Sequence, residues 1–224
     1  MCTVSFVPLK DSYCITSNRD ESILREKAIP PTKYLINNKE IYFPKDPKAG
    51  GTWIAHNNKS SIVLLNGAKE KHIHKTDYRK SRGLIVLDLI SSINPTKEWE
   101  SIDLDNIEPF TIVLFSEEKL FQLQWDGIEK ESVELDANQN HIWSSSTLYE
   151  KEIRERRAIW FKEFIKSENN IDSQKLLNFH QFTESKNKNF GLQINRNNIL
   201  KTISITQCII SKNDITFNYI DLLD

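Results

Sequence analysis

The sequence predicts an α+β fold, with antiparallel strands at both ends of the chain and helices between them. Strand patterns occur at 2–7 and 13–17 near the start of the chain, and at 199–210 and 215–220 near its end. A leucine- and isoleucine-rich run at 82–93 has the length of a helix, and apolar residues at helical spacing indicate another over 147–166. Because no repeat or change of composition divides the chain, we expect a single layered domain over residues 1–224.

The first element is a predicted hairpin. Residues 2–7 alternate in polarity, 8–12 have turn character, and 13–17 form a second strand. A turn centred on this segment makes the numbers of paired residues add up to about 20. Cys2 should therefore lie opposite Asn18, within one residue.

The next segments are a loop and a series of strands. Residues 28–31 contain two prolines, and we expect an extended loop there because proline disfavours regular helix. Further strands are expected at 41–43, 52–56, 61–65, 110–115, 120–125 and 128–135.

The helices have recognisable ends. Asn94-Pro95 should end the helix that begins at Arg82. Thr147 and Glu150 have the spacing of a capping box and should begin the second helix. A short helix is expected at 173–179, before strands at 199–210 and 215–220.

Composition excludes several classes of partner. The net charge of −1 favours neither nucleic acid nor an anionic membrane. No apolar run reaches the ~18 residues of a membrane span, and we expect no signal peptide. The three cysteines lack disulfide or zinc spacing, so we expect a reduced, cytoplasmic protein.

Several short motifs occur in a fixed order along roughly the first 90 residues. Together they resemble the NRDE family, which is named for residues 18–21 and includes the transport-and-Golgi-organisation protein 2 group. The strings are Met1-Cys2-Thr3-Val4, Ser17-Asn18-Arg19-Asp20-Glu21-Ser22, Phe43-Pro44-Lys45-Asp46, Ala49-Gly50-Gly51-Thr52-Trp53-Ile54-Ala55, Leu64-Leu65-Asn66-Gly67 and Lys80-Ser81-Arg82-Gly83.

This resemblance implies both a fold and a reaction class. The NRDE family is similar to the cysteine branch of the N-terminal-nucleophile hydrolases, which includes bile-salt hydrolases and penicillin V acylases. The implied fold has four αββα layers with two stacked antiparallel sheets. The implied reaction is cleavage of a non-peptide amide bond through an acyl-cysteine.

The residues suit such chemistry. Removal of Met1 would leave Cys2 with an α-amine that can act as base for its own thiol. Arg19 would favour the thiolate, Asp20 would orient the amine, and Asn66 would help to bind the oxyanion. Two alternatives stay open: Arg19 and Asp20 as an ordinary ion pair, and Asn66-Gly67 as a simple turn.

Two positions differ from the pattern of the related amidases. Ser145 stands where those amidases carry an asparagine that binds the oxyanion, and loss of such a donor costs about 10²–10³ in rate. Lys201 stands where they carry an arginine. Lys201, Asn18 and Trp53 are the expected substrate-binding residues, although Trp53 is more typical of a core.

The leading hypothesis is therefore a hydrolase or acyltransferase that acts on a small acylated molecule and needs no cofactor. One alternative is a carrier that holds an apolar ligand, in haem trafficking or acyl-lipid handling, in the same pocket. Another is a role in secretion, which rests only on the family name. His72 and His74 have the spacing of metal ligands on a strand, but histidines in a turn are the more common explanation, and we expect no metal.

Overall fold

The expected hairpin opens the fold. In the computed structural model, which describes residues 3–223, β1 (Thr3–Pro8) pairs antiparallel with β2 (Ser12–Ser22). Thr3 lies opposite Asn18, which agrees with the expected register within one residue. Cys2 lies outside the described residues.

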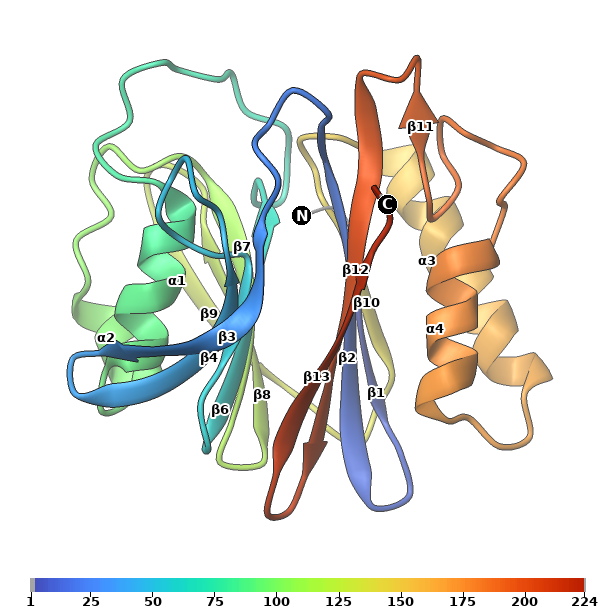
Figure 1. Ribbon diagram of the computed structural model, residues 1–224, viewed down its shortest axis with the longest axis horizontal. Helices are drawn as coiled ribbons and strands as arrows, with labels where there is room; N and C mark the ends of the chain where they lie inside the picture. Colours follow the sequence, from blue (N-terminus) through green and yellow to red (C-terminus); the bar gives the residue numbers. More distant parts are fainter. Residues whose placement is uncertain (1–2, 224) are drawn as a thin grey trace. The chain divides into compact units, whose positions relative to one another are not determined.

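The described chain divides into two compact units, one of which contains the residues up to Arg25 and from Asn138 onward. Its antiparallel sheet has the order β10-β1-β2-β12-β11, and β13 also pairs with β12. Helices α3 and α4 lie along one face of this sheet (Figure 1). The bounds are β10 His141–Ser144, β11 Asn195–Arg196, β12 Leu200–Ser211, β13 Ile215–Asp221, α3 Lys151–Ser167 and α4 Ser173–Phe182.

Apolar side chains attach these two helices to the sheet. Val7 of β1 and Cys14 of β2 pack in one cluster with Phe161 of α3 and with Leu176 and Phe179 of α4. Because side chains alternate along a strand, every second residue of β1 and β2 shares this helix-facing side. The residues between them lie on the opposite side of the same sheet.

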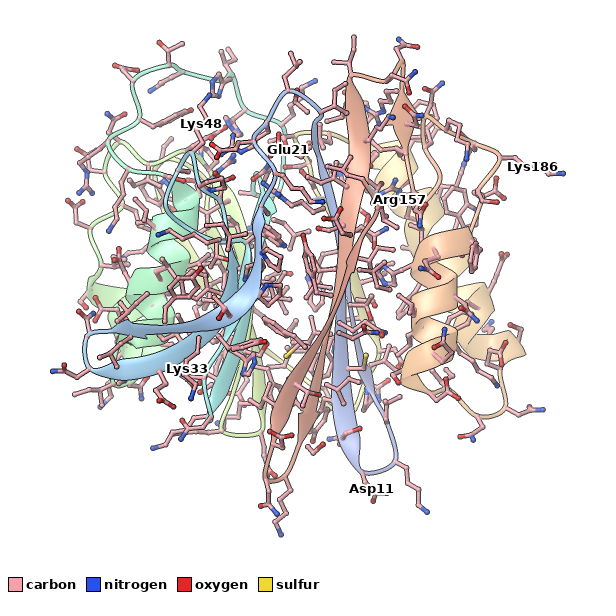
Figure 2. All side chains as sticks on the ribbon, in the orientation of Figure 1. Asp11, Glu21, Lys33, Lys48, Arg157 and Lys186 are labelled. Carbon is pink, nitrogen blue, oxygen red and sulfur yellow. The ribbon has the colours of Figure 1, made fainter. Side chains whose placement is uncertain are left out.

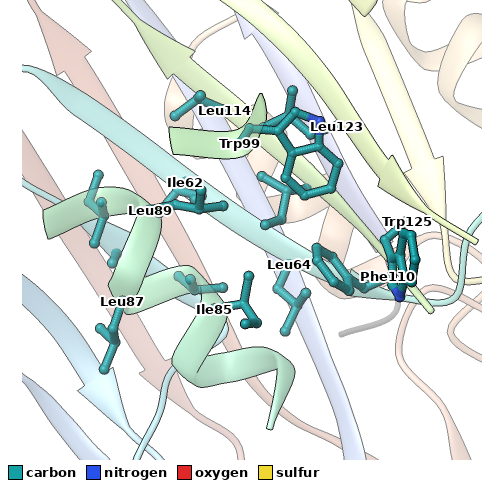
Figure 3. Packing of buried hydrophobic residues seen from close by; sticks show 14 of the residues in the cluster. Ile62, Leu64, Ile85, Leu87, Leu89, Trp99, Phe110, Leu114, Leu123 and Trp125 are labelled. Atoms are coloured by element: carbon teal, nitrogen blue, oxygen red, sulfur yellow. The ribbon is translucent and has the colours of Figure 1, made fainter. Parts of the chain in front are cut away.

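The second unit spans Glu26–Ala137 and contains an antiparallel sheet in the order β3-β4-β5-β6-β7-β8-β9. Its core cluster includes Ile85 and Leu89 of α1, Trp99 of α2, and Ile62 and Phe110 of the sheet (Figure 3). The bounds are β3 Ile29–Ile36, β4 Lys39–Lys45, β5 Ile54–His56, β6 Ser60–Asn66, β7 Phe110–Ser116, β8 Lys119–Trp125, β9 Lys130–Leu135, α1 Arg82–Ser91 and α2 Pro95–Ser101.

The α+β class with antiparallel sheets is thus confirmed, whereas the single domain and the stacking of the sheets stay predictions. The loop expected at 28–31 is wrong, because residues 29–31 begin β3. The two prolines are tolerated since β3 is an edge strand whose pairing with β4 is irregular between Ile29 and Thr32.

Other boundaries also differ from those expected. Helix α1 ends at Ser91, before Asn94. The Asn94 side chain instead caps α2, accepting from the amides of Thr96 and Lys97. Strand β10 was not expected. Helix α3 begins at Lys151, and Glu150 at its N-cap makes no capping hydrogen bond with its side chain, so the expected capping box does not form. No helix within residues 3–223 is long and apolar enough to cross a membrane.

Close packing explains why two positions of the family motifs are glycine. Thr52 N donates to Gly83 O at 3.1 Å, which brings the start of α1 against the turn before β5. A Cβ on Gly51 would lie 2.4 Å from the carbonyl carbon of Gly83, and one on Gly83 would lie 2.8 Å from Thr52 O. Only a residue without a side chain fits at either position.

Candidate active site

The end of β2 carries the NRDE motif, and alternation sends its side chains to opposite faces of the sheet. Asn18 and Asp20 contact groups on the helix-facing side, whereas Arg19 lies on the other side. Arg19 is buried, with 3% of its surface exposed. Its guanidinium lies 3.9 Å from the Glu21 carboxylate, so the motif contains a partly buried ion pair.

Asp20 is held from two directions. Tyr149 Oη donates to Asp20 Oδ2 at 2.6 Å, and Thr202 Oγ1 donates to Asp20 Oδ1 at 2.5 Å. Thr202 lies opposite Asp20 on β12, beside the irregular pairing that precedes Ser204. Both oxygens of this buried carboxylate therefore have fixed positions.

Arg157 of α3 is the buried cation of the same face. It donates to Thr3 Oγ1 and to the backbone oxygens of Phe190 and Gly191, the last at 2.6 Å. Its Cζ lies 3.6 Å from the centre of the Tyr149 ring, within the range of a cation–π contact. One guanidinium thus joins the start of β1, the 190–191 loop and the tyrosine that bonds Asp20.

Asn18 belongs to a second buried network. Its amide nitrogen donates to His180 O at 3.1 Å and to Leu192 O at 2.8 Å, so its oxygen is the atom that lies 2.6 Å from His180 Nδ1. His180 Nδ1 must then donate, and its Nε2 accepts from Ser5 Oγ at 2.8 Å. A direct contact between Asn18 and substrate would require one of these bonds to open.

The serine, histidine and asparagine of this network are the residue types of a nucleophile, a base and an orienting group. However, Ser5, His180 and Asn18 each have no exposed surface. Burial, together with the charge of Arg157, lowers the pKa of His180 to about 3. The histidine is therefore neutral at physiological pH, and the network fixes α4 to the hairpin.

The remaining predicted site residues lie in different places. Ser145, just after β10, is buried, and its hydroxyl lies 2.8 Å from Thr147 Oγ1. Lys201, the second residue of β12, lies opposite Glu21. Asn66 ends β6 and buried Trp53 precedes β5, both in the unit Glu26–Ala137. The convergence of Asn66 and Trp53 with Cys2 stays a prediction.

The two histidines considered as metal ligands share one carboxylate oxygen. His72 Nε2 and His74 Nδ1 each lie 3.2 Å from Glu108 Oε1, while Arg82 pairs with the other oxygen at 2.9 Å. Within the described part of the chain, no group of three or more such side chains is arranged to hold a metal ion.

The sequence analysis did not identify Arg157, Tyr149, Thr202 or His180 as site residues. One signal was present, because Arg157 lies one helical turn after Ile153 on the apolar stripe of α3. A charged residue inside such a stripe is rarely buried without a specific partner. Figure 2 shows Arg157 between the helices and the strands of its unit.

The face of the sheet that carries Arg19 also has buried hydroxyl groups. Ser17 and Thr206 lie opposite each other on β2 and β12, and Ser204 lies opposite Arg19. All three are buried, and among the described residues none of their hydroxyl oxygens has a hydrogen-bond partner. Buried hydroxyls usually have partners, so this face can accept polar groups from elsewhere.

Comparisons with known proteins agree with this architecture. The family model described as Transport and Golgi organisation 2 matches residues 1–212. Among solved structures, a variant of conjugated bile acid hydrolase from Clostridium perfringens is similar, with a TM-score of 0.57 and 12% identity over 99% of this chain and 92% of that one. At this identity the likeness supports the fold alone, and it confirms the expected N-terminal-nucleophile hydrolase-like fold. No curated protein matches the chain.

Proposed function

This chain belongs to the Transport and Golgi organisation 2 family, and from that premise we propose that it is a cysteine N-terminal-nucleophile hydrolase. Its substrate would be a small acylated molecule with a non-peptide amide bond. The enzyme would cleave this bond and pass the acyl group to water or to another acceptor. The observation that carries this proposal is the buried Arg19, which follows Asn18, the partner of the first residue of β1, and lies on the face of the sheet away from the helices. We propose that the positive charge of Arg19 favours the thiolate form of Cys2.

The proposed reaction uses groups that this chain supplies. The α-amine of Cys2 accepts the thiol proton, and the sulfur bonds to the amide carbonyl carbon. Asn66 and Ser145 are the proposed donors to the resulting oxyanion. The ammonium then returns the proton to the leaving amine as the C–N bond breaks. Water, activated by the same amine, hydrolyses the thioester and releases the acid.

The buried hydroxyls support the substrate class. Ser17, Ser204 and Thr206 offer neutral donors and acceptors near Arg19, which suit a carbonyl or carboxylate oxygen better than a cation. We further propose a cytoplasmic location, because Cys14 and Cys208 are not joined in a disulfide, as expected in a reducing compartment.

The test is acyl-enzyme formation with a panel of N-acyl amino acids and N-acyl amines, followed by intact-mass spectrometry. We expect wild type to gain the mass of one acyl group and to release free amine, and Cys2→Ala to do neither. Cys208→Ala is the matched control, because it removes a thiol from the same unit. Equal amine release by wild type and Cys2→Ala would contradict the proposal.

The alternative is a non-catalytic carrier for haem or an acyl lipid. It is favoured by Ser145, whose hydroxyl already has Thr147 as a partner and replaces the amide found in the related amidases. A carrier should bind haem or a fatty acyl probe equally well with or without the Cys2 thiol. A hydrolase should lose turnover in Cys2→Ala while keeping ligand binding.

A further inference from the structure

The side chain of Arg157 is charged, yet it has no exposed surface. Burial of a cation is strongly unfavourable unless several groups solvate it. The oxygens that accept from this guanidinium, those of Thr3, Phe190 and Gly191, are all neutral. The positive charge is therefore solvated but is not neutralised by these bonds.

The bond to Thr3 is the one closest to the proposed chemistry. Thr3 is fully buried, follows Cys2 directly in the chain, and is held by β2 on one side and β10 on the other. Its backbone position is thus fixed by the sheet, and its side chain is fixed by Arg157. The Thr3 nitrogen, at which Cys2 joins the chain, therefore has a fixed position.

A second path leads from the same cation to Asp20. The Tyr149 ring lies under the guanidinium, and the Tyr149 hydroxyl donates to Asp20. A cation above the ring makes the phenol a stronger hydrogen-bond donor, because it withdraws electron density. Arg157 and Asp20 therefore hold opposite charges on the two sides of one tyrosine.

We propose that Arg157 is a positioning residue for the Cys2 nucleophile, which it orients through Thr3 and, through Tyr149, by fixing Asp20. Its buried charge also raises the fraction of Cys2 thiolate. This inference rests on the proposed function. A purely structural arginine would join α3 to the 190–191 loop and would leave the reactivity of Cys2 unchanged.

The experiment measures the rate of Cys2 alkylation by iodoacetamide from pH 5 to pH 10, in folded protein that lacks Met1. Arg157→Met removes the charge and keeps the stem. We expect it to slow alkylation at pH 7 by about tenfold and to move the midpoint of the profile up by about one unit. Arg157→Lys should restore the midpoint, because it restores the charge.

The matched control is Arg156→Met, on the same helix, whose arginine is half exposed and pairs only at the surface with Glu152. Its profile should match wild type. Unfolding in urea identifies the folded variants. A folded Arg157→Met variant with the profile of Arg156→Met would overturn the inference while leaving the proposed function intact.

If Arg157→Met does not fold, two milder variants test the positioning role of Arg157. Thr3→Val keeps the shape of the strand residue and removes the oxygen that Arg157 binds. Tyr149→Phe keeps the ring and removes the bond to Asp20. We expect each variant to change the alkylation rate by at least threefold, or to move the midpoint of the pH profile by at least half a unit. Unchanged profiles in both would overturn the inference. A wild-type Cys2 no more reactive than a cysteine in unfolded protein would instead refute the proposed function, and the inference with it.

Discussion

His180 Nδ1 donates to Asn18 Oδ1 at 2.6 Å, although the two residues are 162 positions apart in the chain. This bond joins α4 to the strand that carries the NRDE motif. It requires a neutral imidazole with its proton on Nδ1, because Nε2 accepts from Ser5. Stability should therefore depend on pH in a predictable way.

The first prediction concerns this histidine. Its pKa is lowered to about 3 in the folded protein, so between about pH 6.5 and pH 3 the unfolded state binds a proton that the folded state does not. Its contribution to stability is complete above pH 6.5 and is lost as the pH falls. At pH 5 the loss should be about 2 kcal/mol.

Urea unfolding at pH 7 and pH 5 measures this effect. His180→Gln should be less stable than wild type at pH 7 but should lose about 2 kcal/mol less on acidification. The control is His74→Gln, because 67% of the His74 side chain is exposed. Equal acid sensitivity of wild type and His180→Gln would show that His180 titrates normally.

The second prediction concerns the contact between Gly83 and Thr52. Alanine usually stabilises a helix relative to glycine by about 1 kcal/mol. Gly83→Ala should instead destabilise by about 2 kcal/mol, because its Cβ would lie 2.8 Å from Thr52 O. In Gly50→Ala the new Cβ would have no atom within 4 Å. This variant should lose only about 1 kcal/mol of stability, because Gly50 has a positive φ. Chemical denaturation of both variants measures the difference, and a stabilised Gly83→Ala protein would contradict the close approach.

The third prediction concerns the other thiols. Burial raises the pKa of the Cys14 thiol to about 11, despite its hydrogen bond to Thr16, and Cys208 is also fully buried. Neither should react with iodoacetamide at pH 7.5 until the protein unfolds, because the thiolate is the reactive form. Peptide mapping after timed alkylation checks this. Modification of Cys14 in folded protein at the rate of a free cysteine would show that the hairpin opens.

Much of the fold could be predicted because its signals are local. Alternating polarity and a short turn gave the β1–β2 hairpin nearly in register. The elements that the sequence did not predict also have local causes. Helix α2 (95–101) and strand β10 (141–144) are too short to give a clear pattern. The prolines in β3 are tolerated because β3 is an edge strand.

The site was less predictable because its contacts are distant in sequence. The motif identified Arg19 and Asp20, but nothing near residue 20 indicates that Tyr149 and Thr202 hold its carboxylate. Arg157 and His180 belong to helices, where charged and polar residues are usually solvent-exposed. Only the tertiary fold buries them, so their roles follow from the structure.

The central claim is that Cys2 acts as an N-terminal nucleophile, which requires its nitrogen to be a free amine. The most direct test is the intact mass of protein produced without a tag at this end. The account predicts a mass lower than that of the full sequence by one methionine, and a single rapid alkylation that peptide mapping assigns to Cys2. Quantitative retention of Met1 would contradict it, because an amide nitrogen cannot take the thiol proton.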